Sequence, residues 1–269
     1  MGSSTGKELN IETAALTDPG LVRGNNEDSV FLIDKRESNA FGSETFGIYL
    51  VADGMGGHLG GEVASETAMR TISTTLLDKL KSTSESRPPS LLLKQAIERA
   101  HNDILDVAGS KPELRSMGTT VTVGLRLDFD LYLGHVGDSR AYLIRENRIR
   151  QLTEDHSVVA LLLKRGAITP REARTHPDKG KILRCLGITR DVTIDTFIRD
   201  NAEGKLTLRG RDALVFCSDG LTDYVSDGEI LNCVSRRSHP GEACRDLIDM
   251  ANSRGGGDNT SVIIVRVRS

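Results

Sequence analysis

This sequence lacks the features that mark zinc-cluster, membrane and nucleic-acid-binding proteins. It has only four cysteines, with no CxxC pair and no Cys/His cluster at the spacing of a zinc site. No apolar run reaches the roughly 18 residues of a membrane-spanning helix, and residues 1–7 lack the apolar core of a signal peptide. The net charge of −3 gives no bulk positive face for nucleic acid. We therefore expect a soluble cytoplasmic protein that binds neither membrane nor nucleic acid, with Cys217 and Cys244 packed in its core.

The chain is long enough for a substantial core. Its 269 residues, 38% of them hydrophobic, suit one large domain or two small ones. Residues 1–7 are small and polar, and we expect them to form a disordered or vector-derived tail.

Apolar periodicity predicts both helices and strands. Apolar residues four apart predict helices over 61–80 and 90–108, the second ended by Gly109. A capping box at Ser226 and an apolar face over 241–254 predict two helices near the C-terminus. Short apolar or alternating runs predict strands over 11–16, 29–33, 46–52, 119–127, 131–136, 140–144, 148–152, 213–218 and 261–267.

The order of these elements predicts an α+β sandwich. The four strands between 119 and 152 follow one another through short turns, which is typical of an antiparallel meander. Residues 155–199 hold one short predicted helix (156–165) and little strand character, which indicates a functional flap. Two central sheets with pairs of helices outside them fit this order.

Carboxylates recur beside glycine or small polar residues at the ends of the apolar runs. The segments that carry them are 25–28, 51–57, 135–140, 216–221 and 255–260. Carboxylates that converge repel one another unless a cation compensates their charge. Ligands that are all oxygen favour Mg or Mn over Zn.

Each motif also has a simpler interpretation. A lone Asp-Gly is usually a turn, but Asp53 and Asp219 both end apolar runs, where a partly desolvated carboxylate needs a partner. Arg23 is either half of a weak surface salt bridge or a fork that grips phosphate. His58 is either a surface histidine or a proton donor.

Two further segments and two histidines also have a simpler interpretation. Residues 118–120 could be only a strand edge, and residues 138–140 only a hairpin turn. His156 and His176 lie in the flap and are interpreted as residues at its solvent or substrate edge.

Taken in order and spacing, these motifs resemble one family. The chain closely resembles the metal-dependent serine/threonine protein phosphatases of the type 2C (PPM) family, most of all the compact bacterial members, over about residues 10–268. The motifs that carry the resemblance are Arg23-x-x-Asn26-Glu27-Asp28, Asp53-Gly54-Met55-Gly56-Gly57, Gly118-Thr119-Thr120, Gly137-Asp138-Ser139-Arg140, Ser218-Asp219-Gly220-Leu221 and Gly257-Asp258-Asn259.

The resemblance implies a fold and a metal site. The fold would be a four-layer α/β/β/α sandwich, with two antiparallel sheets flanked by helix pairs, in one catalytic domain over 8–269. A binuclear Mn²⁺ or Mg²⁺ centre would lie in a cleft at one end, with a third, weaker ion beside it. The residues implied as metal ligands are Glu27, Asp28, Asp53, Gly54 (through its carbonyl), Asp138, Asp219 and Asp258.

Within that centre the resemblance implies distinct roles. Asp53 would bridge the two ions, Arg23 would bind the phosphate, and Asn259 would support the ligands. Eukaryotic members often carry a histidine directly after the Asp-Gly pair as the presumed general acid, whereas this chain has Met55. His58 or a water is therefore the expected proton donor.

The implied activity is hydrolysis of phosphoserine and phosphothreonine on proteins by a metal-activated water, in signalling by dephosphorylation. The partners would be phosphorylated proteins and a cognate serine/threonine kinase, and we expect a monomer because no helix shows a sustained coiled-coil seam. Two alternatives are a non-catalytic regulator that binds phosphoproteins and a hydrolase of small phosphate esters. Basic flap residues form either a solvated face or a selector of acidic substrates; they are Lys164, Arg165, Arg171, Arg174, Lys179 and Lys181.

Overall fold

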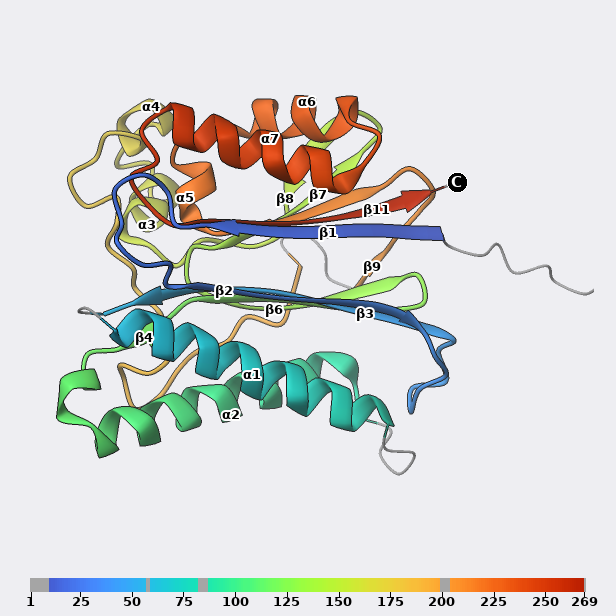
Figure 1. Cartoon of the computed structure of the whole chain (residues 1–269), viewed down its shortest axis with the longest axis horizontal. Helices are drawn as coiled ribbons and strands as arrows, with labels where there is room; N and C mark the ends of the chain where they lie inside the picture. Colours follow the sequence, from blue (N-terminus) through green and yellow to red (C-terminus); the bar gives the residue numbers. More distant parts are fainter. Residues whose placement is uncertain (1–9, 57–58, 82–86, 199–203, 269) are drawn as a thin grey trace, which may run out of the picture.

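The chain folds into four layers, with two β-sheets face to face between two layers of helices (Figure 1). The computed structural model describes residues 10–56, 59–81, 87–198 and 204–268. The predicted tail over residues 1–7 lies outside these ranges. Both sheets are antiparallel, so the predicted α+β sandwich is confirmed.

The first sheet joins the two ends of the chain. Its order is β1-β11-β10-β7-β8, and its strands are β1 (Asn10–Asp18), β11 (Thr260–Arg268), β10 (Ala213–Cys217), β7 (Arg140–Arg145) and β8 (Arg148–Gln151). The second sheet has the order β2-β3-β5-β6-β9, with β4 paired to β3. Its strands are β2 (Asp28–Arg36), β3 (Thr45–Met55), β4 (Gly118–Thr119), β5 (Val121–Leu127), β6 (Asp130–Val136) and β9 (Leu206–Thr207).

A pair of helices covers the outer face of each sheet. α1 (Gly60–Lys81) and α2 (Pro89–Ser110) lie on the second sheet, while α6 (Asp227–Arg236) and α7 (Pro240–Ser253) lie on the first (Figure 1). Apolar side chains fill three layers, one under each helix pair and one between the sheets. Short elements gather at one end of the sandwich: α3 (Val158–Lys164), α4 (Pro170–Ala173) and α5 (Asp219–Thr222), while the single-turn helix η1 (Pro112–Leu114) follows α2.

Three sequence-based expectations were wrong in detail. Gly109 does not end α2, which continues to Ser110. β3 does not end at Asp53 but continues to Met55, because Gly54 and Met55 pair with β4. The expected meander is two hairpins in different sheets: β5 pairs with β6 in one, and β7 with β8 in the other.

The crossing between these hairpins lies at Gly137, whose φ of 114° is in the region that favours glycine. The chain leaves the second sheet after Val136 and enters the first at Arg140. The loop that carries Asp138 therefore links the sheets at the end where α3 and α5 lie.

A buried ionic network holds the middle of the second sheet. Arg126 is only 1% exposed and donates to Asp34 at 2.8 Å and to the Tyr49 hydroxyl at 3.1 Å. The capping box predicted at Ser226 is present at the start of α6. All four cysteines lie among the described residues and are free, with Cys217 and Cys244 buried as predicted. Among the described helices, none combines the length and the apolar character of a membrane-spanning segment.

Candidate metal and phosphate site

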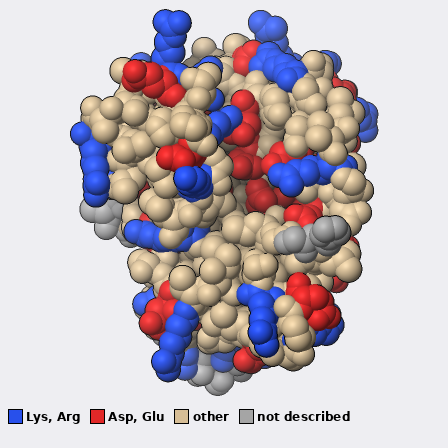
Figure 2. All heavy atoms as spheres, turned by 90° about the vertical axis from the view of Figure 1, so that its left-hand side faces the viewer, with Lys and Arg blue, Asp and Glu red and all other residues tan. Residues whose placement is uncertain are grey.

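The predicted carboxylates converge at one end of the sandwich. Asp28 begins β2 and faces Asp53 of β3 as its register partner. Asp219 begins α5 directly after β10, and Asp258 lies two residues before β11. Figure 2 shows acidic side chains at the bottom of a hollow on this face, with Lys and Arg around it.

Residues 118–120 fix the backbone of Asp53. The Thr120 amide and the Thr119 hydroxyl both donate to the Asp53 carbonyl, each at 2.9 Å. The Asp53 amide in turn donates to the Thr120 hydroxyl at 3.2 Å. These threonines are therefore more than a strand edge, because they position the backbone of the central carboxylate.

Two glycines allow the close approach of β3 to the start of α1. A Cβ on Gly54 would lie 2.1 Å from the Gly61 carbonyl oxygen, and a Cβ on Gly61 would lie 2.6 Å from Glu27 Oε2. The Gly54 amide also donates to the Glu27 carbonyl at 3.1 Å. Only residues without a Cβ fit here, so this glycine pair determines where the Glu27 carboxylate lies.

Side chains from the first sheet fasten the ligands of the second. The Ser218 hydroxyl donates to Asp28 Oδ2 at 2.8 Å and accepts from the Ser261 amide at 2.9 Å. Asn259 Oδ1 accepts from the Glu27 amide at 2.8 Å. The predicted supporting role of Asn259 thus has a geometric basis, because it orients the loop that carries Glu27.

Arg23 is paired with one of the expected metal ligands. Its guanidinium donates to Asp258 Oδ2 at 2.8 Å. This contact with Asp258 raises the pKa of Arg23. Arg23 is exposed, and a guanidinium has the planar geometry that suits phosphate.

The Asp138 loop completes the site from a third direction. Asp138 is 7% exposed, and the neighbouring Ser139 hydroxyl hydrogen-bonds that of Thr120 at 2.8 Å. Arg140 forms a bidentate pair with Asp155, from Nε to Oδ1 at 3.0 Å and from Nη2 to Oδ2 at 2.6 Å. Both Arg140 and Arg23 therefore pair with a carboxylate, and Arg23 is the more exposed of the two.

The concentration of carboxylates disfavours their ionised forms. Burial raises the pKa of Asp28 to about 7 and that of Asp219 to about 6, with further contributions from neighbouring carboxylates. Burial, followed by the charges of other aspartates, also raises the pKa of Asp53 and Asp138 well above the usual range. The site is therefore one in which a bound cation would be compensated by negative charge already in place.

The donor set fits a hard divalent cation. Asp28 Oδ1 and Asp138 Oδ1 are buried and lack a hydrogen-bond partner, and a buried carboxylate oxygen without a partner is costly. As they stand, no three His, Cys, Asp or Glu side chains in the described ranges form a group that could hold a metal ion. In this arrangement Asp53 is hydrogen-bonded to Asp219, and Asp258 to Arg23.

The flap segment forms one wall of an adjoining pocket. This pocket of about 540 Å³ has Asp138 and Asp219 on one side and residues of α3 and α4 on the other. Lys179 ties the segment to α5 through Asp223 at 2.9 Å. Of the predicted basic residues, Lys164 and Lys181 pair with acidic neighbours in their own region, while Arg174 and Lys179 line the pocket.

Two histidine predictions have different outcomes. His58 lies outside the described residues. His156 is buried rather than at the edge, because its ring accepts from the Gly137 amide at 3.1 Å and contacts Asp195 at 3.0 Å. The placement expected for His156 was therefore wrong; it fastens the flap to the Asp138 loop.

Sequence reasoning gave no role to Ser218, Thr119, Thr120 or Gly61. All except Gly61 stand inside the motifs, but their type alone does not reveal which backbone or carboxylate they contact. Gly61 stands next to Gly60 at the start of α1, a place where glycine is common, so the sequence held no signal for its role.

Comparisons with known proteins agree on one family. The sequence pattern that defines Protein phosphatase 2C matches residues 19–161. The chain is 36% identical over 252 residues to "Serine/threonine phosphatase stp" of Listeria welshimeri, covering 93% of each chain. It is 35% identical over 265 residues to "Serine/threonine protein phosphatase PstP" of Mycobacterium tuberculosis, covering 96% of this chain and 45% of that protein.

Solved structures give the same result. The catalytic domain of the phosphatase PstP in complex with two manganese ions matches with a TM-score of 0.79 and 33% identity, over 97% of this chain and 100% of that one. The phosphatase Stp1 from Staphylococcus aureus matches with a TM-score of 0.84 and 29% identity, over 100% of both chains.

Proposed function

Since this chain belongs to the Protein phosphatase 2C family and is a serine/threonine phosphatase, we propose that it hydrolyses phosphoserine and phosphothreonine in proteins at a binuclear Mn²⁺ or Mg²⁺ centre. The observation that carries the proposal is the convergence of buried and half-buried carboxylates from both sheets on one hollow (Figure 2). The residues proposed to hold the ions are Glu27, Asp28, Asp53, Gly54, Asp138, Asp219 and Asp258. Cations bound there would supply a Lewis acid that activates a water for attack on phosphorus.

The chain's own residues have separate tasks in this proposal. Asp53 lies in the centre, with Asp28, Asp219 and Asp138 around it, so we assign it the bridging position. Asp138 and Asp219 flank the flap pocket, where we place the third, weaker ion.

Arg23 is proposed to bind the phosphoryl oxygens. In this structure it neutralises Asp258, so its two anionic partners would be exchanged during the catalytic cycle. If a cation compensated the charge of Asp258, the Arg23 guanidinium would be free to form charged hydrogen bonds with phosphate. The proton donor is proposed to be His58 or a water, since Met55 cannot transfer a proton.

The wall of the flap pocket is proposed to select substrates. Arg174, the residue that caps α4, lines that pocket, whereas Arg171 within α4 does not. Charge reversal at Arg174 should therefore raise KM for a phosphopeptide with acidic flanks, while Arg171→Glu serves as the matched control. Equal KM values for the two variants would exclude a role of Arg174 in substrate selection. The natural substrates are proposed to be phosphoproteins of a cognate serine/threonine kinase, and the protein is proposed to act as a monomer.

A direct assay tests the main proposal. Phosphate release is measured from a phosphothreonine peptide, a phosphotyrosine peptide and a nucleotide, each with Mn²⁺ and with EDTA. We expect rapid Mn²⁺-dependent release from the phosphothreonine peptide alone. Faster release from the nucleotide would favour a hydrolase of small phosphate esters, and phosphopeptide binding without turnover would favour the non-catalytic regulator.

The Arg23→Ala variant tests the role of the guanidinium. Loss of charged hydrogen bonds worth about 1.5–3 kcal/mol should lower kcat/KM by roughly 10- to 100-fold. Arg99→Ala, at an exposed position on α2, is the control with the same charge change. Similar kcat/KM values for the two variants would exclude a direct role of Arg23.

A further inference from the structure

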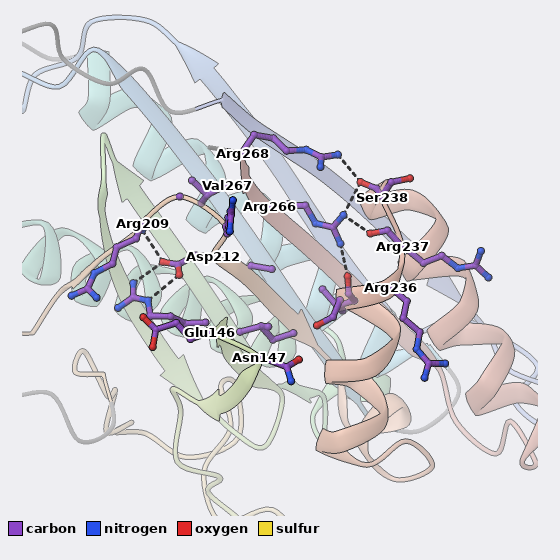
Figure 3. A pocket seen from close by; sticks show the side chains of 17 residues that line it. Glu146, Asn147, Arg209, Asp212, Arg236, Arg237, Ser238, Arg266, Val267 and Arg268 are labelled. Atoms are coloured by element: carbon purple, nitrogen blue, oxygen red, sulfur yellow. Dashed lines mark hydrogen bonds and ion pairs between the residues drawn. The ribbon is translucent and has the colours of Figure 1, made fainter.

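A second pocket lies at the opposite end of the sandwich from the acidic hollow. It has a volume of about 730 Å³ and lies between the β7–β8 turn, the segment before β10, the last residues of β11 and the end of α6 (Figure 3). The two ends are joined by the same strands: β7 runs from Arg140, near the acidic site, to Arg145 in this pocket. The pocket is thus a separate site in the same sheet.

The lining of this pocket is strongly basic, in a chain whose net charge is −3. Seven of its 17 lining residues are arginines and two are acidic, Glu146 and Asp212. None of the 17 is aromatic. The arginines are Arg145, Arg209, Arg211, Arg236, Arg237, Arg266 and Arg268.

Structural roles account for some of these arginines. Arg145 pairs with Asp212, which is 1% exposed, through two contacts of 2.9 and 2.6 Å. Arg268 pairs with Glu12 at 2.7 Å, and Arg237 pairs with Asp246. These ion pairs neutralise part of the charge around the pocket.

Arg266 holds its charge without a carboxylate. Its guanidinium donates to the main-chain carbonyls of Val234, Arg237 and Ser238 around the end of α6 (Figure 3). Burial, followed by the charge of Arg268, lowers the pKa of Arg266. Since the pKa of an arginine starts far above neutral pH, Arg266 stays protonated there and contributes a positive potential to this wall of the pocket.

Three exposed arginines remain. Within the described ranges, no side chain forms a hydrogen bond or ion pair with the guanidinium of Arg209, Arg211 or Arg236. Figure 3 places Arg209 and Arg236 at opposite edges of the pocket, with both side chains extending outward from it. Arg211 has a φ of 73°, a left-handed conformation that is uncommon for a residue with a Cβ and that often marks functional positions.

From this arrangement we propose that the pocket binds an anion that carries two or more phosphate groups. Guanidinium forks recognise phosphate in a bidentate manner, and exposed arginines at the edges of a basic pocket suit a ligand with separated charges. The volume lies within the range of about 300–1,000 Å³ found for small-ligand sites. The absence of aromatic lining residues argues against recognition of a nucleotide base, which usually stacks on an aromatic ring. The phosphates are carried either by a free polyphosphate or by a phosphorylated peptide segment.

Calorimetry on the complete, metal-free protein tests this site separately from the catalytic one. Tripolyphosphate is titrated into the protein in EDTA at low salt, a condition in which the uncompensated acidic hollow repels phosphate. We expect saturable binding that the double change Arg209→Ala and Arg236→Ala weakens at least tenfold. The double change Arg70→Ala and Arg99→Ala, at exposed positions on α1 and α2, alters the net charge equally and should leave the affinity within twofold.

A further variant guards against a folding defect. Arg211→Gly removes a guanidinium but suits the left-handed backbone, so its melting temperature should not fall while its affinity for tripolyphosphate drops. A doubly phosphorylated serine peptide and its unphosphorylated form provide the second arm. Pocket-dependent binding that is tighter for the phosphopeptide identifies a peptide-borne ligand, and the reverse identifies a free polyphosphate. The proposal would be overturned if the unchanged protein did not bind tripolyphosphate, or if the two double variants lost affinity equally. Neither measurement depends on phosphatase activity.

Discussion

Replacement of Asp53 by Asn should stabilise the metal-free protein while it abolishes metal-dependent activity. Burial and the charges of Asp28, Asp219 and Asp138 all disfavour the ionised Asp53. The same direction holds for the neighbouring Asp28, where burial raises the pKa to about 7, and each pKa unit corresponds to about 1.4 kcal/mol.

An asparagine amide recovers only part of that cost, because it is buried among acceptors and needs partners of its own. We therefore expect the free energy of unfolding in EDTA at pH 8 to rise by about 2 kcal/mol, which raises the melting temperature by roughly 4–8 °C. The variant should also lose the stabilisation that Mn²⁺ gives to the unchanged protein, since ligands bound only to the native state stabilise it.

The pH dependence has a defined sign. A carboxyl group whose pKa is raised in the folded state penalises folding above that pKa, and the penalty is relieved as the group becomes protonated at lower pH. The advantage of Asp53→Asn in EDTA should therefore be largest at pH 8 and shrink as the pH falls through 7 and 6 toward 4.

The assay is thermal unfolding of both proteins in EDTA and in Mn²⁺ from pH 5 to pH 8, with phosphopeptide turnover measured in parallel. Asp106→Asn, at an exposed position on α2, is the control for a lost surface charge. A variant less stable than the unchanged protein in EDTA at pH 8, or one that Mn²⁺ still stabilises fully, would refute the reasoning.

Three further predictions concern packing and titration. Gly54→Ala should destabilise the fold by about 1–3 kcal/mol and weaken Mn²⁺ binding, because its Cβ would lie 2.1 Å from the Gly61 carbonyl oxygen. Urea unfolding measures the stability and Mn²⁺ titration the affinity. An unchanged stability and affinity would contradict the close approach of Gly54 to Gly61. Burial lowers the pKa of His135 from 6.5 to about 4, so its stabilising contribution is present above pH 6.5 and is lost as the pH falls toward 4, by about 3 kcal/mol in all. His135→Asn should flatten this acid limb of the stability curve, and an unaltered limb would exclude His135 as its source. Arg126→Ala should destabilise the protein by about 3–5 kcal/mol, since it leaves the largely buried Asp34 without its cation. A decrease in the free energy of unfolding in urea below about 1 kcal/mol would show that the network around Arg126 contributes little to stability.

The sequence by itself determined most of the elements and predicted the chemistry of the site. Periodicity identified the long helices and most strands because one face of each must be apolar to be buried. The motifs identified the carboxylates because an acidic residue at the end of an apolar run is forced to find a partner. The type 2C resemblance rested on the same residues, and the comparisons with known proteins confirmed it.

Only the tertiary structure decided which residues meet. Arg23 and Asp258 are 235 positions apart, and their contact depends on the loop before β2 lying beside the one before β11. The loop that begins at Gly137 sends β5 and β6 to one sheet and β7 and β8 to the other. The alternation of apolar and polar residues is similar in these strands and cannot reveal which sheet each one joins. The arginines of the basic pocket likewise come from segments far apart in the sequence, because the order of strands in the sheet, not their order in the chain, decides which side chains lie close together.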